Sequence, residues 1–392
     1  MGRRTLVWSE APDPKLRSPR GAIVRPIAAA RCDLDGAFLR SGLTTTAARV
    51  AGALRLLDPL VFETFGNRPF EGPFPYGHEC VAEVVRVGEE VRGVRVGDNV
   101  VVPFQISCGD CSPCARGLTA HCTTDRQSPV AAYGFGAATG AWGGAVSDLL
   151  YVPHADAMLV PVPDGVDPIS LASASDNLPD GYRTVAAHLA AMPEAPVLVV
   201  GGQAKSVGLY AVASAVALRS SRVDYVDRSR ERLQIAERLG ANPIALDRRA
   251  RLFSGPAKGR FDTYPIAVDA SGSAKGLAFA IRSLAPGGVC TTVAFYLRNG
   301  TPIPLWRMMV RGNTLVTGLA NVRADLPAVL ELVRSGRLRP ELVTSVTAAW
   351  DDAPTAFLER ATKVVVSRPP MLNPARGSEM VPFPAPFAPT PR

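Results

Sequence analysis

The pattern of apolar and polar positions changes character near the middle of this 392-residue chain. Before residue 160, short apolar runs such as Val81–Val87 and Val100–Phe104 are separated by Gly and Pro. Runs of this length between turn residues are typical of short strands. The first part of the chain is therefore predicted to be a β-rich lobe built around a small barrel.

From residue 196 onwards, apolar strands alternate with helices. The predicted strands are Pro196–Val200, Val223–Val226, Ile266–Val268 and Val289–Ala294, and the predicted helices are Val207–Leu218, Glu231–Leu239 and Leu277–Leu284. Strands that alternate with helices indicate βαβ units and a parallel, doubly wound sheet. The predicted fold class is thus α/β, with a β-barrel lobe joined to a doubly wound domain.

The alternation stops near residue 320, where a helix over Leu326–Ser335 and a closing strand over Lys363–Val366 are predicted. We therefore divide the chain into a first lobe (1–177), an α/β domain (178–319), a return to the first lobe (320–368) and a Pro-rich tail (369–392). The composition of that tail favours an extended or disordered segment.

The composition is that of an ordinary globular protein, with 47% hydrophobic and 20% charged residues. No apolar run reaches the roughly 18 residues that a membrane-spanning helix needs, and the first residues lack the apolar segment of a secretory signal. We therefore expect a cytoplasmic protein without membrane contact. The net charge of +8 arises mostly from arginine, since five of the 43 basic residues are lysines. These charges are dispersed along the chain, so nucleic acid is not an expected partner.

Four of the seven cysteines lie within fifteen residues, at the spacing C-x2-C-x2-C-x7-C. In a reducing compartment such a cluster indicates metal binding rather than disulfide bonds. Four thiolates form the closed tetrahedral ligand set of a structural zinc site. The predicted ligands are Cys108, Cys111, Cys114 and Cys122.

A second metal site is suggested by His78, which lies in the triplet Gly77-His78-Glu79 before an apolar strand. A catalytic zinc needs two more protein ligands and an open position for a substrate oxygen. Cys32 and Asp176 are the candidates. Taken singly, each is more often a core thiol or a surface carboxylate than a ligand.

A glycine-containing loop follows the strand Pro196–Val200 and leads into a predicted helix. Glycines at such a turn let the amides of a helix N-terminus approach a pyrophosphate. The loop departs from G-x-G-x-x-G because it lacks the middle glycine. Asp227, nineteen residues beyond Gly208, ends the next strand, where a carboxylate binds ribose hydroxyls.

A carboxylate at this position repels a 2′-phosphate, so NAD is expected rather than NADP, although Arg228 could soften the preference. The predicted cofactor-binding residues are Gly201, Gly202, Lys205, Ser206, Val207, Gly208, Asp227 and Arg228. Lys205, Arg323 and Lys363 are candidates to neutralise phosphate charge, with solvated surface charges as the alternative.

Together these motifs resemble those of the medium-chain, zinc-dependent alcohol dehydrogenase superfamily over residues 20–367. The resemblance implies a GroES-like barrel lobe, a Rossmann-type domain, and hydride transfer between an alcohol or aldehyde and NAD(P). It also implies that Cys32, His78 and Asp176 bind a catalytic zinc, that Glu79 can move onto the metal, and that Asp35 orients the zinc-bound histidine. The aspartate ligand is similar to that of the branch containing glutathione-independent formaldehyde dehydrogenases.

Leu34 departs from the family pattern. Many relatives carry Ser or Thr there, whose hydroxyl relays the alcohol proton to solvent, whereas a leucine side chain has no hydrogen-bonding group. Asp33 and Ser175 are the nearest substitutes in sequence. A second interpretation is a family member that keeps the fold and the structural zinc but has lost alcohol chemistry, and that reduces an activated alkene or acts as a sensor. A zinc-stabilised nucleic-acid-binding protein is a third interpretation, but it would not need Asp227 or the βαβ series.

The apolar stretch Ser41–Pro75, with a predicted helix over Ala47–Leu57, lies between two metal-ligand candidates. It is expected either to cover the active-site mouth or to form an oligomer contact. The expected partners are a small-molecule substrate and further copies of the same chain, in a dimer or tetramer.

Overall fold

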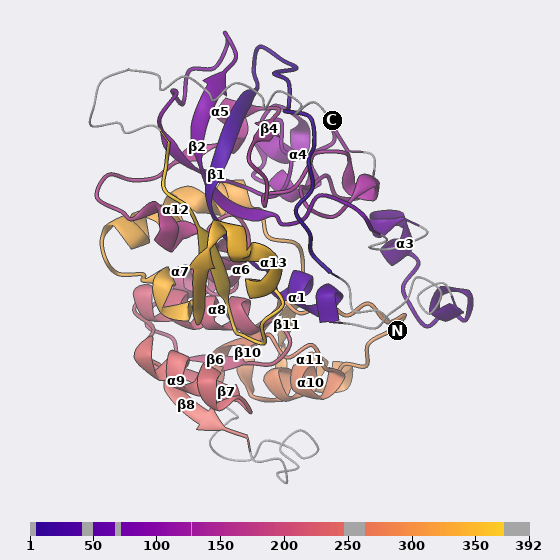
Figure 1. Cartoon of the computed structure of the whole chain (residues 1–392). Coiled ribbons are helices and arrows are strands. Elements are labelled where there is room, and N and C mark those ends of the chain that lie inside the picture. Colours follow the sequence, from indigo (N-terminus) through magenta and orange to yellow (C-terminus); the bar gives the residue numbers. More distant parts are fainter. Residues whose placement is uncertain (1–4, 41–49, 67–71, 127, 247–262, 372–392) are drawn as a thin grey trace, which may run out of the picture.

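Two sheets organise the chain in a computed structural model that describes residues 5–40, 50–66, 72–126, 128–246 and 263–371. The indigo and purple strands of the first lobe lie at one end of the molecule in Figure 1, and the pink and orange elements of the second lobe lie at the other. Among the described residues, none of the helices is both long and apolar enough to cross a membrane.

The first sheet has seven strands in the order β12-β13-β1-β2-β3-β5, with β4 also paired to β1. Its strands are β1 (Ala22–Ala30), β2 (Glu79–Val87), β3 (Asn99–Val102), β4 (Leu150–Val152), β5 (Val160–Pro161), β12 (Val346–Ala349) and β13 (Val364–Ser367). The predicted strands Val81–Val87 and Lys363–Val366 correspond to β2 and β13. Because β12 and β13 join β1, the end of the described chain returns to the first lobe.

Short helices connect these strands. They are α1 (Asp33–Arg40), α3 (Leu60–Phe65), α4 (Ser112–Ala115), α5 (Ala155–Met158) and α13 (Ala353–Ala356), together with the 3-10 turns η1 (Thr119–His121), η2 (Ala137–Thr139), η3 (Pro168–Leu171), η4 (Pro340–Val343) and η5 (Trp350–Asp352). The predicted helix Ala47–Leu57 falls partly outside the described residues, and residues 50–53 are helical.

The second sheet is parallel throughout and has six strands in the order β11-β10-β9-β6-β7-β8. Its strands are β6 (Val197–Val200), β7 (Val223–Asp227), β8 (Asn242–Ala245), β9 (Tyr264–Asp269), β10 (Leu284–Thr292) and β11 (Thr314–Val316). Read from the other edge, this is the doubly wound order in which β6 and β9 flank the switch point. Ligands bind such sheets at the carboxyl ends of the strands beside that point.

The helices of the second half are α6 (Asn177–Arg183), α7 (Ala186–Ala191), α8 (Lys205–Ala217), α9 (Arg230–Arg238), α10 (Ala274–Arg282), α11 (Leu305–Arg311) and α12 (Val322–Arg334). Helix α8 is apolar on all sides and almost wholly buried, as expected of a helix enclosed between layers. The predicted alternation of strands and helices is thus confirmed. The exact segment boundaries remain predictions, and residues 372–392 of the Pro-rich tail lie outside the described residues.

Candidate active site

Three side chains from distant parts of the sequence meet in the first lobe. Cys32 follows β1, His78 precedes β2, and Asp176 is the residue before α6. One donor atom from each lies within 4.8 Å of the other two, and His78 Nε2 is 3.3 Å from Asp176 Oδ2. A thiolate, an imidazole and a carboxylate form a donor set that suits zinc and leaves a fourth position open. The residues therefore fit a catalytic zinc.

The sheet register explains why two of these donors meet. Ala30 at the end of β1 pairs with Glu79 at the start of β2. Cys32 and His78 therefore lie just beyond the same end of this strand pair. Asp176 is brought there by its neighbour Ser175, whose buried hydroxyl donates to the Cys80 carbonyl and accepts from the Cys80 amide, both at 2.7 Å. Ser175 therefore pins the turn to β2. Ser175 was a candidate for the proton relay. Its hydroxyl is instead held in two hydrogen bonds with the backbone of Cys80.

The electrostatics of the three-donor site favour a cation. Burial lowers the pKa of His78, but Asp35 and Asp176 raise it, and the balance is a pKa of about 9. Burial raises the pKa of the Cys32 thiol well above its usual value, and the carboxylates of Asp176 and Glu79 raise it further. The carboxylates that surround Cys32 and His78 thus favour positive charge at this place, and a bound zinc would supply it.

Asp35 lies behind the imidazole, with Oδ1 3.5 Å from His78 Nδ1. Its position agrees with the expected task of orienting the histidine. Glu79, in contrast, is not one of the three donors. Its fully buried carboxylate forms an ion pair with Lys363 Nζ at 2.5 Å, so its movement onto the metal remains a prediction.

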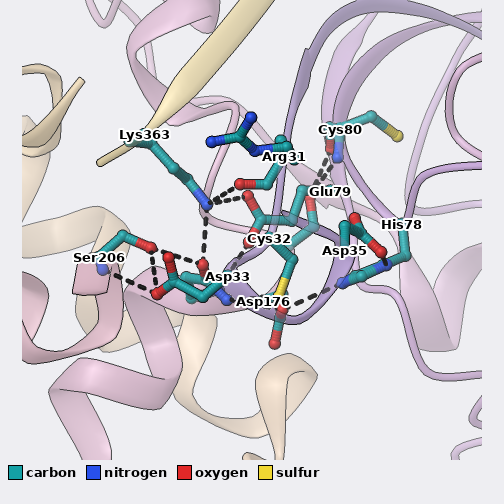
Figure 2. A network of polar contacts seen from close by, with 12 residues as sticks. Arg31, Cys32, Asp33, Asp35, His78, Glu79, Cys80, Asp176, Ser206 and Lys363 are labelled. Carbon is teal, nitrogen blue, oxygen red and sulfur yellow. Dashed lines mark hydrogen bonds and ion pairs between the residues drawn. The ribbon is translucent and has the colours of Figure 1, made fainter. Parts of the chain in front are cut away.

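The position of Lys363 corrects both expectations for this residue, because it is neither solvated nor directed at a phosphate. It is fully buried, and its three protons go to Glu79 Oε2, to the Arg31 carbonyl at 3.2 Å and to Asn177 Oδ1 at 2.8 Å. The carboxylate of Glu79 keeps the pKa of Lys363 above its usual value despite burial. Figure 2 shows the Lys363 ammonium group pointing toward Glu79.

Asn177 is a site residue that the sequence did not reveal. Its amide donates to Asp176 Oδ2 at 2.7 Å and lies 3.3 Å from Cys32 Sγ, while its carbonyl oxygen accepts from Lys363. One amide thus touches two metal donors and the buried lysine. An asparagine beside a candidate ligand carries no signal of such a role in a single sequence.

The four-cysteine cluster is assembled as predicted, with one sulfur from each cysteine within 4.8 Å of the others. All seven cysteines are free of disulfide bonds. Hydrogen-bond donors approach Cys108 Sγ from the Cys111 amide at 3.3 Å and the Thr124 hydroxyl at 3.0 Å. Donors of this kind stabilise thiolates, so the cluster fits a closed structural zinc site.

In the loop after β6, tight packing explains the glycines. A Cβ on Gly202 would lie 2.6 Å from the Ser271 carbonyl oxygen, and one on Gly208 would lie 2.9 Å from Ala270 Cβ. A Cβ on Gly201 would collide with Asp227 and Tyr225. The glycines therefore let the loop and α8 lie against the ends of neighbouring strands, which is one of the tasks of glycines in dinucleotide-binding turns.

Asp227 differs from the expected free ribose-binding carboxylate. Arg232 binds it in a bidentate pair, with Nε to Oδ2 and Nη2 to Oδ1 both at 2.7 Å. The Tyr225 hydroxyl and the amides of Arg228 and Ser229 donate to it as well. Burial raises the pKa of Asp227, but these contacts outweigh burial and keep the pKa below its usual value. They occupy both oxygens, so a ribose would have to share or displace them.

One cavity joins the candidate metal donors to the loop after β6. Cys32, Asp33, Leu34, Asp176, Asn177 and Asp180 line it from the metal side, and Gln203, Ala204, Val207, Val293 and Phe295 line it from the second lobe. Of the predicted cofactor residues, Val207 reaches this cavity, whereas Ser206 is bonded to Asp33. Leu34 is part of the lining. The cavity wall therefore has a leucine at the position where a Ser or Thr hydroxyl was expected to relay the alcohol proton.

The described part of the 41–75 stretch lies beside the metal donors. Phe65 of α3 contacts Phe135 with ring centroids 6.1 Å apart, and Phe135 stacks on His78 at 4.5 Å. On its other side, this stretch forms a bridge between Leu57 and Arg298 of the second lobe. These contacts place the described part of the stretch near His78, while both alternatives, a cover over the active-site mouth and an oligomer contact, stay predictions.

A barrel lobe, a Rossmann-type domain and a Cys-His-Asp donor set in a shared cavity define the class of zinc- and dinucleotide-dependent dehydrogenases. Comparison with known proteins agrees. Residues 19–164 match the alcohol dehydrogenase GroES-like domain family, and residues 206–335 match the zinc-binding dehydrogenase family. The chain is 30% identical to a probable zinc-binding alcohol dehydrogenase of Mycobacterium tuberculosis, over 88% of this chain and 80% of that protein.

The chain therefore belongs to the zinc-binding alcohol dehydrogenase family. A glutathione-independent formaldehyde dehydrogenase of Bacillus subtilis is 33% identical, but over only 45% of this chain and 43% of that protein. The solved structure of an alcohol dehydrogenase from Thermus sp. ATN1 superposes with a TM-score of 0.75 at 29% identity, over 92% of this chain and 95% of that one.

The predicted superfamily and fold class are thus confirmed. The protein is a zinc-dependent oxidoreductase of the alcohol and aldehyde class, and its cofactors are zinc and NAD(P).

Zinc content tests the assignment of the two donor clusters. The wild-type chain should carry two zinc ions, and Cys32→Ala and Cys111→Ala should each carry one, because each change removes a ligand from a different cluster. Cys111→Ala should also unfold more easily, since structural zinc contributes directly to folding. Metal analysis of the purified proteins, with Cys290→Ala as a control for the loss of a buried thiol, checks this. Two zinc ions in Cys111→Ala would contradict the structural assignment.

Removal of the buried lysine should destabilise the protein strongly. Lys363→Met leaves the Glu79 carboxylate buried and uncompensated, so we expect the free energy of unfolding to fall by about 3–5 kcal/mol. The double variant Lys363→Met/Glu79→Gln should recover part of that loss. Urea unfolding of the zinc-loaded proteins measures both values.

Arg339→Met is the matched control for that experiment, because it breaks an exposed ion pair with Glu341. Its expected cost is below about 1 kcal/mol. Equal losses for Lys363→Met and Arg339→Met would show that the buried pair contributes no more than a surface one.

Proposed function

We propose that hydride transfer between an alcohol or aldehyde and a nicotinamide dinucleotide takes place in the cavity lined by Cys32, Asp176 and Val207. The observation that carries this proposal is the shared lining, since metal donors and the cofactor loop face one space. A substrate oxygen at the open metal position would then be close to a nicotinamide ring bound against the loop after β6. Figure 2 draws Cys32, His78, Asp176 and Ser206 in one view.

The residues around the donors position them. When bound, zinc supplies a Lewis acid that lowers the pKa of an alcohol or polarises a carbonyl. Asp35 lies 3.5 Å from His78 Nδ1, and the side-chain amide of Asn177 contacts both Asp176 and Cys32. Lys363 fixes Asn177 and balances Glu79. Because these supports are buried, and Asn177 and Lys363 are hydrogen-bonded as well, the donors should keep their geometry before a ligand arrives.

We infer that NAD is preferred to NADP. Asp227 ends β7 in the position where a carboxylate recognises the ribose, and its charge opposes a 2′-phosphate. The bidentate pair with Arg232 weakens that opposition, because the guanidinium neutralises the carboxylate. The expected preference is therefore modest rather than absolute.

The lining also suggests the type of substrate. Leu34, Val293 and Phe295 give the cavity apolar walls, and Phe135 lies against His78. Apolar walls favour substrates that bury hydrocarbon surface, because burial of such surface is favourable. We propose an alcohol or aldehyde that is larger and less polar than formaldehyde.

Leu34 supports a second candidate function, in which the chain keeps the fold but reduces an activated alkene or acts as a sensor. A leucine in the cavity cannot relay an alcohol proton. The metal count separates the two candidates: two zinc ions per chain favour the alcohol dehydrogenase, whereas one favours the altered relative.

We also propose a cytoplasmic homo-oligomer. Helix α11 exposes Leu305, Trp306, Met309 and Val310, and the neighbouring strand β11 lies at the edge of the parallel sheet. An exposed apolar helix next to a sheet edge is typical of an interface between protein copies. A two-fold arrangement would cover both at once.

A substrate screen tests the proposed reaction. Reduction of NAD and of NADP is followed with short alcohols, aromatic alcohols and polyols, and the reverse direction with the matching aldehydes. Mutation of a residue that only supports a metal ligand typically costs roughly 10- to 100-fold in activity. Cys32→Ala removes a ligand itself, so its loss of activity should be larger. Cys290→Ala, which alters a buried thiol of β10, should retain activity. Equal activity of Cys32→Ala and wild type on every substrate would refute the catalytic-zinc assignment.

Light scattering after size exclusion tests the proposed interface. Trp306→Glu places a charge at the centre of the exposed face of α11 and should shift the protein to monomers, because an unpaired charge would be buried. Glu331→Lys, on the exposed surface of α12, is the control and should leave the mass unchanged. A Trp306→Glu protein of unchanged mass would rule out this face as the interface.

A further inference from the structure

Helix α8, which follows the loop after β6 in the second lobe, is capped by a residue of the first lobe. Its own N-cap residue, Ala204, has no side chain that can accept a hydrogen bond. Asp33 takes that role: its Oδ2 accepts from the Ser206 amide at 2.8 Å and lies 2.9 Å from the Ser206 hydroxyl. N-caps normally come from the adjacent residue, whereas this one comes from 173 residues away.

Asp33 is the first residue of α1 and follows the metal donor Cys32 directly. Its carboxylate therefore spans the boundary between the metal lobe and the cofactor domain. Figure 2 shows Asp33 and Ser206 facing each other beside the metal donors. Asp33 lines the same cavity as Ala204, the N-cap residue of α8, and Val207 in its first turn.

We propose that Asp33 is an internal competitor for the diphosphate of the dinucleotide, and that cofactor binding displaces its carboxylate from α8. This inference rests on the proposed function, in which the loop after β6 receives the cofactor. The amides at the start of a helix are the donors that a dinucleotide diphosphate uses in this type of domain. An amide that already donates to Asp33 is not available to a phosphate oxygen, and the two anions repel each other at short range.

The contacts of Ser206 extend this competition to the metal donors. Its hydroxyl lies 2.8 Å from Asn177 Oδ1 as well as 2.9 Å from Asp33, and its single proton serves one of them at a time. When Asp33 leaves, the hydroxyl can donate fully to Asn177. Asn177 in turn holds Asp176 and Cys32. Cofactor arrival thus tightens the support of the metal donors, while Asp33 keeps cofactor affinity low.

Calorimetric titration of the zinc-loaded protein with NADH tests the proposal. Asp33→Asn keeps the size of the side chain but removes its charge, so NADH should bind roughly ten- to a hundredfold more tightly, since hydrogen bonds to a charged group no longer have to be broken. ADP-ribose, which carries the same diphosphate without the nicotinamide, should gain to a similar extent. Thermal unfolding without cofactor should show a lower midpoint for Asp33→Asn, because an interlobe contact is weakened.

Asp180→Asn is the matched control, because Asp180 lines the same cavity but pairs with Arg183 rather than with α8. It should change NADH affinity much less than Asp33→Asn. An equal gain in both variants would mean that the overall charge of the cavity controls affinity, and the proposal would be overturned. If Asp33→Asn does not fold, as judged by its zinc content, Asp33→Ser replaces it.

Two further outcomes distinguish a failure of the competitor from a failure of the proposed function. If wild type binds NADH and Asp33→Asn binds it no better, Asp33 is only an interlobe contact, and the proposed function is unaffected. If neither protein binds NADH or NADPH, the proposed dinucleotide site itself fails, and the competitor with it.

Discussion

The buried ion pair between Lys363 and Glu79 holds the active site in place. Lys363 lies next to β13, Glu79 begins β2, and Asn177, the third partner, begins α6. Three segments that are far apart in the sequence therefore meet at one ammonium group. A buried charge without a partner is costly, so these segments have to assemble together or not at all. The donors Cys32, His78 and Asp176 lie directly beside or within these segments, and their geometry follows from that assembly.

The metal half and the cofactor half of the cavity are balanced differently. Around Cys32 and His78, carboxylates outnumber the cations among the described residues, and a metal ion completes the balance. At the cofactor loop, the protein satisfies its own groups, since Arg232 occupies Asp227 and Asp33 occupies the start of α8. A zinc ion would therefore add charge that the surrounding carboxylates favour, whereas a dinucleotide at the proposed site would have to replace contacts that the protein makes with itself. The metal would thus bind where negative charge is in excess, and the dinucleotide where the protein's polar groups already have partners.

Local patterns were sufficient to predict much of this structure. Strand–helix alternation predicted the parallel sheet, because each element satisfies its own period of apolar positions. The cysteine spacing predicted the four-sulfur cluster, because its ligands lie within one short loop. The grouping of Cys32, His78 and Asp176 came from the family resemblance, since nothing in their separate neighbourhoods brings them together.

Contacts between distant residues were beyond prediction. Lys363 was expected at a phosphate or in solvent, but its burial depends on Glu79, which is 284 positions away. Asp227 was correctly placed at the end of its strand, but the bidentate contact with Arg232 depends on how α9 begins. Asn177 and the cap from Asp33 likewise depend on the meeting of the two lobes, which leaves no trace in a single sequence.

The segment 50–66 has a mechanical consequence for the molecule. Through Phe65 it is attached to the aromatic stack on His78, and through Leu57, with backbone bonds from Asp58 to Leu297 and from Asn299 to Leu56, it is attached to the second lobe. Any rotation of one lobe against the other must stretch this strap or carry it along. Segment 50–66 thus links the angle between the lobes to the ring of His78, so that a hinge movement would act on one of the three candidate metal donors.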